Sequence, residues 1–71
     1  MTILNESNEM VFYELSNQSG GLPPHLTTQL RLESEPDNLS LKSRGRFIGN
    51  YNVRNNTRVT IQANGFVEVS N

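Results

Sequence analysis

Apolar and polar side chains alternate along several short runs of this sequence, and turn-forming residues separate the runs. Residues 10–15, MVFYEL, are rich in aromatic and β-branched side chains and lead into a Ser-Gly-Gly turn. Residues 28–34 and residues 39–42 each place leucine at alternate positions between polar neighbours. Alternation with a period of two residues predicts half-buried strands, and no stretch shows a sustained helical period.

The final strand pair can be predicted residue by residue. In RVTIQANGFVEVS, residues 58–70, a two-residue Asn64-Gly65 turn would place Ile61 opposite Glu68 on one face, which conflicts with the pattern. A three-residue loop over 63–65 removes the conflict by pairing Gln62 with Phe66, Ile61 with Val67, Thr60 with Glu68, and Val59 with Val69. We therefore predict a type I turn in which Gly65 adopts the left-handed conformation in a bulge.

The length of the chain limits how much surface it can bury. Seventy-one residues allow one domain, and a chain of this size buries roughly 60 to 65% of the surface that its unfolded form exposes. Pairing of two copies into a homodimer would add burial. We predict a single all-β domain over 1–71, an antiparallel meander or small open barrel of four to six short strands with at most one helical turn. Residues 1–9 are expected to form a loose N-terminal arm.

The side-chain chemistry gives little support for catalysis. The sequence contains no cysteine and one histidine, His25, so the usual Cys/His zinc sites cannot form. No acid is positioned to orient His25 as a base. Glu33 and Glu35 would point to one side of a strand, as a cation site or acid pair requires, but a solvated strand edge is the simpler interpretation. We predict a protein that is not an enzyme, with no catalytic residue, no metal and no cofactor.

The N-terminal residues and the hydropathy pattern bear on location. Residues 1–10 have neither the basic region nor the apolar run of a secretory signal, and no later segment approaches the length of a membrane-spanning stretch. A cytoplasmic location without membrane contact is therefore expected.

The first candidate binding site is the segment SGGLPPHL, residues 19–26. The two glycines allow any backbone direction, whereas the two prolines fix φ and force the residues before them toward extended geometry. A stiff extended loop loses little entropy on binding, which suits it to a cleft in a partner protein. The alternative is a rigid crossover loop whose leucines pack into the core. The candidate partner-binding residues are Gly20, Gly21, Leu22, Pro23, Pro24, His25 and Leu26, with Leu22 or Leu26 as the anchor.

The second candidate site follows from the charge distribution. Residues 1–37 carry a net charge of −5 and residues 38–71 one of +4. Cations near Phe47 and Tyr51 would suit a nucleic-acid site in which a ring stacks on a base. A solvated basic strand end that offsets the acidic half of the chain is the alternative. The candidate nucleic-acid contacts are Lys42, Arg44, Arg46, Arg54 and Arg58.

A family resemblance covers residues 10–41. An opening strand is followed by Ser19-Gly20-Gly21-Leu22 and by the strand that carries Leu30 and Leu32. This arrangement resembles the start of emfourin-type proteins, small bacterial inhibitors of thermolysin-like metalloproteases. The resemblance implies a protein-binding module, in its narrowest form a proteinaceous protease inhibitor that occludes a cleft with the Gly20–Leu26 loop.

A second resemblance covers residues 39–69. The element Gly45-Arg46-Phe47-Ile48 and the terminal hairpin are similar to the swapped-hairpin group of AbrB-type regulators, MazE-type antitoxins and SymE-type toxins. This resemblance implies a small dimeric nucleic-acid-binding regulator or toxin–antitoxin component in which Arg44 and Arg46 face nucleic acid.

Overall fold

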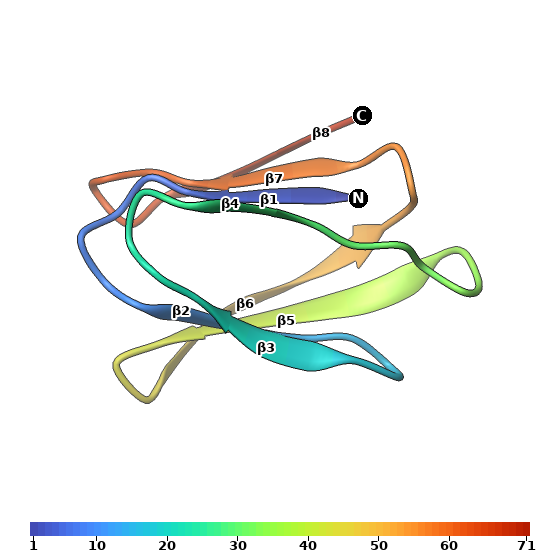
Figure 1. Ribbon diagram of the computed structural model, residues 1–71, viewed down its shortest axis with the longest axis horizontal. Helices are drawn as coiled ribbons and strands as arrows, with labels where there is room; N and C mark the ends of the chain where they lie inside the picture. Colours follow the sequence, from blue (N-terminus) through green and yellow to red (C-terminus); the bar gives the residue numbers. More distant parts are fainter.

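The computed structural model describes all 71 residues. The fold contains eight strands and no helix. The strands form two four-stranded sheets stacked as a sandwich (Figure 1), one in the order β4-β1-β7-β8 and the other in the order β3-β2-β5-β6. Their bounds are β1 Thr2–Asn5, β2 Val11–Glu14, β3 Ser19–Leu22, β4 Thr27–Gln29, β5 Asp37–Ser43, β6 Arg46–Val53, β7 Arg58–Ile61 and β8 Val67–Ser70. The predicted all-β class is confirmed, but eight strands replace the expected four to six, and two stacked sheets replace a single meander or open barrel.

The N-terminal segment is an inner strand of the first sheet. Residues 1–9 do not form the loose arm that was expected, because β1 pairs antiparallel with β4 and parallel with β7. Ile3, in the middle of β1, is fully buried. The α-amino group of Met1 also donates a hydrogen bond to the carbonyl of Leu30 at 2.7 Å. The β1–β7 pair is the one parallel pair in the fold, and it joins the N-terminal strand to the C-terminal hairpin.

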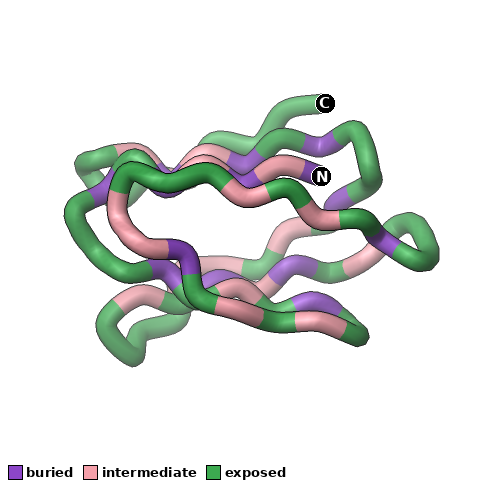
Figure 2. The backbone as a smooth tube through the Cα atoms, viewed as in Figure 1, coloured by how far each residue is buried: buried purple, intermediate pink, exposed green.

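The core lies between the two sheets, and most of its residues occupy alternate strand positions, whereas Met1, Leu15 and Leu32 lie outside the strands. Figure 2 marks the buried residues along the backbone. Burial of these apolar groups is the main favourable contribution to folding in such a small domain. The buried apolar residues are Met1, Ile3, Val11, Leu15, Leu22, Leu32, Leu39, Leu41, Val53, Val59 and Ile61.

The strand expected over 28–34 ends early, at Gln29, and the residues that follow are irregular. Leu32 is nevertheless buried, because the side chain of Asn55 holds its backbone. Asn55 Oδ1 accepts from Leu32 N at 2.8 Å, and Asn55 Nδ2 donates to Leu32 O at 3.3 Å. A side chain thus replaces the backbone partner that a neighbouring strand would have supplied.

The register predicted for the last hairpin is confirmed. Ile61 pairs with Val67 and Val59 with Val69, and Gly65 has a φ of 90°. The backbone N–H of Gly65 donates to the carbonyl of Gln62 at 2.9 Å, closing the three-residue loop. Of the four apolar side chains on this face, only Val69 is substantially exposed, because it lies near the end of the edge strand β8.

Gly65 offers a direct test of this turn. Replacing Gly65 by Ala places a Cβ in left-handed backbone and should destabilise the domain by about 1 kcal/mol. No atom lies within 4 Å of the added Cβ, so strain alone accounts for the loss. Gly65→Asn should cost less, because asparagine tolerates this conformation. Urea titrations followed by circular dichroism would measure both, and equal effects for the two variants would contradict the turn assignment.

Candidate functional site

Four chain connections meet at one end of the sandwich, on the left in Figure 1. The strand registers bring them together: Leu22 at the end of β3 lies opposite Val11 at the start of β2, and Val11 lies opposite Ser43 at the end of β5. In the other sheet, β1 ends beside the start of β4 and the end of β7. We call this surface the loop end, and it comprises residues 6–10, 23–26, 43–47 and 62–66.

The buried side chain of Asn5 organises two of these connections. Its Nδ2 donates to the carbonyls of Leu22 at 2.9 Å, Glu9 at 2.8 Å and Pro23 at 3.2 Å. Its Oδ1 accepts from the backbone N–H of Ser7 at 3.0 Å and from the Ser7 hydroxyl at 2.6 Å. Asn5 is only 1% exposed, and satisfied polar groups in such surroundings fix local geometry strongly. Segments 6–10 and 23–26 are therefore held together without a disulfide.

The segment 23–26 is a tight turn and not the extended loop that was expected. His25 adopts a left-handed φ of 63°, and its Nε2 lies 2.9 Å from Asn8 Oδ1. Gly20, Gly21 and Leu22 belong to β3, and Leu22 is buried in the core, so Leu22 cannot anchor a partner. Leu26 projects outward with 52% of its surface exposed. Of the predicted loop, only Pro23 to Leu26 is presented to solvent at the turn.

Exposed apolar side chains gather at the loop end. Four of the six large apolar residues that the fold leaves exposed lie there, and each comes from a different connection: Met10, Leu26, Phe47 and Phe66. Phe66 is 71% exposed, although its neighbour Val67 packs against the core. Single exposed apolar residues are ordinary on protein surfaces, whereas a group of them is typical of an interaction site.

A cleft of ≈ 420 Å³ opens between the connections of the two sheets at this end. One wall comes from segment 6–10, another from the β5–β6 hairpin, and the third from the β7–β8 turn. Ile61 contributes from the end of β7. The lining residues are Ser7, Asn8, Glu9, Ser43, Arg46, Phe47, Ile48, Ile61, Ala63, Asn64 and Gly65.

The structure divides the five predicted nucleic-acid contacts between two ends of the molecule. Lys42, Arg44 and Arg46 lie at or beside the β5–β6 turn, at the loop end. Arg54 and Arg58 lie around the β6–β7 connection, at the opposite end. The cations therefore do not form one basic face.

One basic side chain of the loop end is already paired. Arg44 Nη1 lies 3.7 Å from Glu9 Oε1, so the acidic and basic halves of the sequence meet at this surface. Arg46, which lines the cleft, remains exposed beside the apolar group. The loop end thus combines apolar side chains with charges of both signs.

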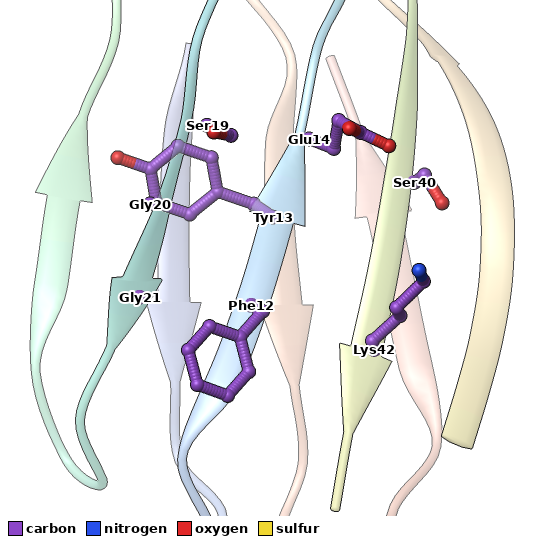
Figure 3. A pocket seen from close by; sticks show the side chains of 8 residues that line it. All are labelled: Phe12, Tyr13, Glu14, Ser19, Gly20, Gly21, Ser40 and Lys42. Carbon is purple, nitrogen blue, oxygen red and sulfur yellow. The ribbon is translucent and has the colours of Figure 1, made fainter. Parts of the chain in front are cut away.

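A second hollow lies on the outer face of the sheet β3-β2-β5-β6. This shallow groove of ≈ 340 Å³ runs over β3, β2 and β5, and Figure 3 shows Phe12 beside Gly21, with Glu14, Ser40 and Lys42 toward β5. Phe12 is 51% exposed, so the groove has one aromatic wall that the core does not use.

At the end of the sandwich opposite the loop end, two acidic side chains accept hydrogen bonds from a backbone N–H group and from a hydroxyl group. Glu35 accepts a hydrogen bond from the backbone N–H of Asn55, and Glu33 is exposed. The Ser16 hydroxyl donates to Asp37 Oδ2 at 2.9 Å, which is the main reason why the pKa of Asp37 lies below its usual value. The structure contains no group of three His, Asp or Glu side chains placed to share a metal ion.

Sequence patterns indicated Leu26, His25 and Arg46 as candidates but missed Asn5, Met10 and Phe66. Phe66 could have been found, because the three-residue turn at 63–65 leaves the residue after it at the hairpin tip. Asn5 carries no sequence signal, since its partners are backbone atoms of segments up to 18 residues away.

No family model, no curated protein and no solved structure matches this chain. The structure also contains no helix of the length and apolar character needed to cross a membrane.

Proposed function

We propose that this protein is a non-enzymatic protein-binding module and that the loop end is its binding surface. The observation that carries the proposal is the gathering of Met10, Leu26, Phe47 and Phe66 from four separate connections at one end of the sandwich. Aromatic and large apolar anchors dominate the energetics of protein interfaces, and a rim of charged groups excludes wrong partners.

The bracing of the surface by Asn5 supports this function. Binding orders side chains and loops, and each ordered group reduces the affinity that contacts would otherwise give. Segments 6–10 and 23–26 are already fixed by the hydrogen bonds of Asn5, and His25 is held beside Asn8. Met10 and Leu26 are therefore presented on a backbone that needs little reorganisation.

A protease is the narrower form of the proposed partner. The likeness of residues 10–41 to emfourin-type inhibitors supports it, and the presented turn would enter a cleft with Leu26 as its anchor. The tight turn at Pro24-His25 gives a shorter contact than an extended segment, so neighbouring connections of the loop end would supply the rest of the interface. A nucleic-acid partner has less support, because Arg54 and Arg58 lie far from Arg44 and Arg46.

Leu26 provides the test. Immobilised protein should retain a specific partner from the lysate of its native source, and the identified, purified partner should bind Leu26→Ala at least about tenfold more weakly, the loss typical of an interface anchor. A thermolysin-like metalloprotease, assayed with a peptide substrate, tests the narrower form directly. Affinity would be measured by isothermal titration calorimetry.

Val69→Ala is the matched control, because Val69 is an exposed apolar residue near the end of β8, away from the loop end. It should bind the partner as the unmodified protein does. Full affinity in a Leu26→Ala, Phe66→Ala double variant would refute the loop end as the binding surface. If the unmodified protein did not inhibit the protease, the tested class of protease would be ruled out as the partner. The binding assay with the lysate partner would still test protein binding by itself.

A further inference from the structure

The groove on the outer face of the sheet β3-β2-β5-β6 is built from two rows of cross-strand neighbours. In the first row, Phe12 lies between Gly21 on β3 and Lys42 on β5. In the second row, Glu14 lies between Ser19 on β3 and Ser40 on β5. Aromatic rings, a carboxylate, an amine and two hydroxyl groups thus line the same groove, as Figure 3 shows.

Gly21 gives the groove its flat floor. A Cβ at this position would lie 3.2 Å from Phe12 Cε1 and 3.4 Å from the sulfur of Met10, so the absence of a side chain lets the Phe12 ring lie against β3. Tyr13, which also lines the groove, is partly buried and packs against the core. The ring of Phe12 is therefore a supported apolar platform that remains half exposed.

The charged groups of the groove have no partner within the chain. The one ion pair in the structure joins Arg44 to Glu9, so Glu14 and Lys42 are both unpaired. Because their charges are opposite, a simple cation or anion would meet one attractive and one repulsive side chain. An ionic ligand would gain little here, since exposed ion pairs contribute only about 0 to 1 kcal/mol. A neutral ligand rich in hydroxyl groups would instead gain charge-assisted hydrogen bonds to both side chains.

We propose that this groove binds a neutral sugar ring. The apolar C–H face of a pyranose would lie on Phe12, the Glu14 carboxylate would accept hydrogen bonds from hydroxyl groups, and Lys42 would donate to a hydroxyl oxygen. Ser19 and Ser40 can both donate and accept. A groove of ≈ 340 Å³ has the size of a small-molecule site, and its open shape leaves room for a sugar within a longer chain. This ligand site lies on the face of the sheet and adjoins the loop end at Met10 and Lys42.

Affinity electrophoresis tests the proposal with defined probes. The purified protein would be run through native gels that contain soluble β-glucan, xylan, galactomannan or α-mannan. At least one of these neutral polysaccharides should retard it. Phe12→Ala should abolish the retardation, and Glu14→Gln should weaken binding at least about tenfold, a loss typical of a hydrogen bond to a charged group. Gly21→Ala should also weaken binding, because the added Cβ displaces the Phe12 ring.

Glu68→Gln is the matched control for Glu14→Gln, because Glu68 is exposed on β8 of the other sheet. It should migrate as the unmodified protein does. Circular dichroism would verify that each variant is folded, which is expected because Phe12 and Glu14 lie on the outer face. Amide shifts in a 15N-labelled sample, titrated with oligosaccharides of the retarding polysaccharide, should map to residues 12–14, 19–21 and 40–42.

Three results would overturn the proposal. The first is the absence of retardation by all four neutral polysaccharides. The second is retardation that Phe12→Ala retains. The third is a response of the groove amides to a free amino acid zwitterion, or to heparin, without a response to any neutral saccharide, because the occupant would then be an ionic ligand.

Discussion

Removal of residues 1–5 is expected to abolish cooperative folding. These residues form β1, which lies between β4 and β7, so its loss leaves two strands without their shared partner and removes Ile3 from the core. Unpaired backbone groups in the interior and lost apolar burial each cost several kcal/mol, a large part of the ~5 to 15 kcal/mol that stabilises an ordinary domain. Urea titration followed by circular dichroism should show no sigmoidal transition.

Removal of Ser70 and Asn71 is the control for this truncation. It shortens the edge strand β8 and breaks the hydrogen bond from Thr57 Oγ1 to Asn71 Oδ1, but it leaves every core residue in place. The shortened protein should unfold cooperatively with a modest loss of stability. A cooperative transition in the protein that lacks residues 1–5 would contradict the inner position of β1.

Asn5→Ala is expected to be the most damaging substitution of a polar residue. It would leave the carbonyls of Leu22, Glu9 and Pro23 without the donor that Asn5 Nδ2 supplies, and Ser7 without its acceptor. A buried group left unsatisfied costs about 1 to 3 kcal/mol, so a loss of about 3 kcal/mol or more is expected for the set. Amide hydrogen exchange should also accelerate in segments 6–10 and 23–26.

Asn56→Ala is the matched control, since Asn56 is an exposed asparagine in the turn before β7. The free energy of unfolding of the Asn56→Ala variant should differ from that of the unmodified protein by less than about 0.5 kcal/mol, as for most surface substitutions. If the two variants were equally stable, Asn5 would not brace the loop end. Since the loop end depends on this bracing, Asn5→Ala should also weaken binding of the proposed protein partner.

Alternating side chains made several strands predictable, but other strands were missed. The pattern of β2, β5 and the β7–β8 hairpin reflects one buried face and one solvated face, and it even determined the register at Gly65. β1 was missed although its buried and half-buried positions alternate, because residues 1–9 were interpreted as an arm. β3 is SGGL, in which glycines replace the side chains that would have formed a pattern.

The candidate surfaces were harder to predict than the strands. Sequence reasoning placed Leu26 and Arg46 on separate candidate sites, yet both lie at the loop end. Their proximity depends on which strands pair across the sheets, and the parallel pairing of β1 with β7 has no short-range signal. The assignment of Leu22 as an anchor was wrong for the same reason: whether a leucine beside prolines faces solvent or the core is decided by its partner strand, here β2 at Val11.

The parallel pairing of β1 with β7 has a consequence for biosynthesis. Ile3 is synthesised 56 residues before its partner Val59. Contacts between such distant residues form slowly, because a long chain segment must close before any pairing energy is gained. During this interval β1 can pair only with β4, and its exposed apolar residues make the nascent chain prone to aggregation and to chaperone binding. The sandwich can therefore be completed only after β7 has been synthesised, whereas the second sheet can form earlier from β2, β3, β5 and β6.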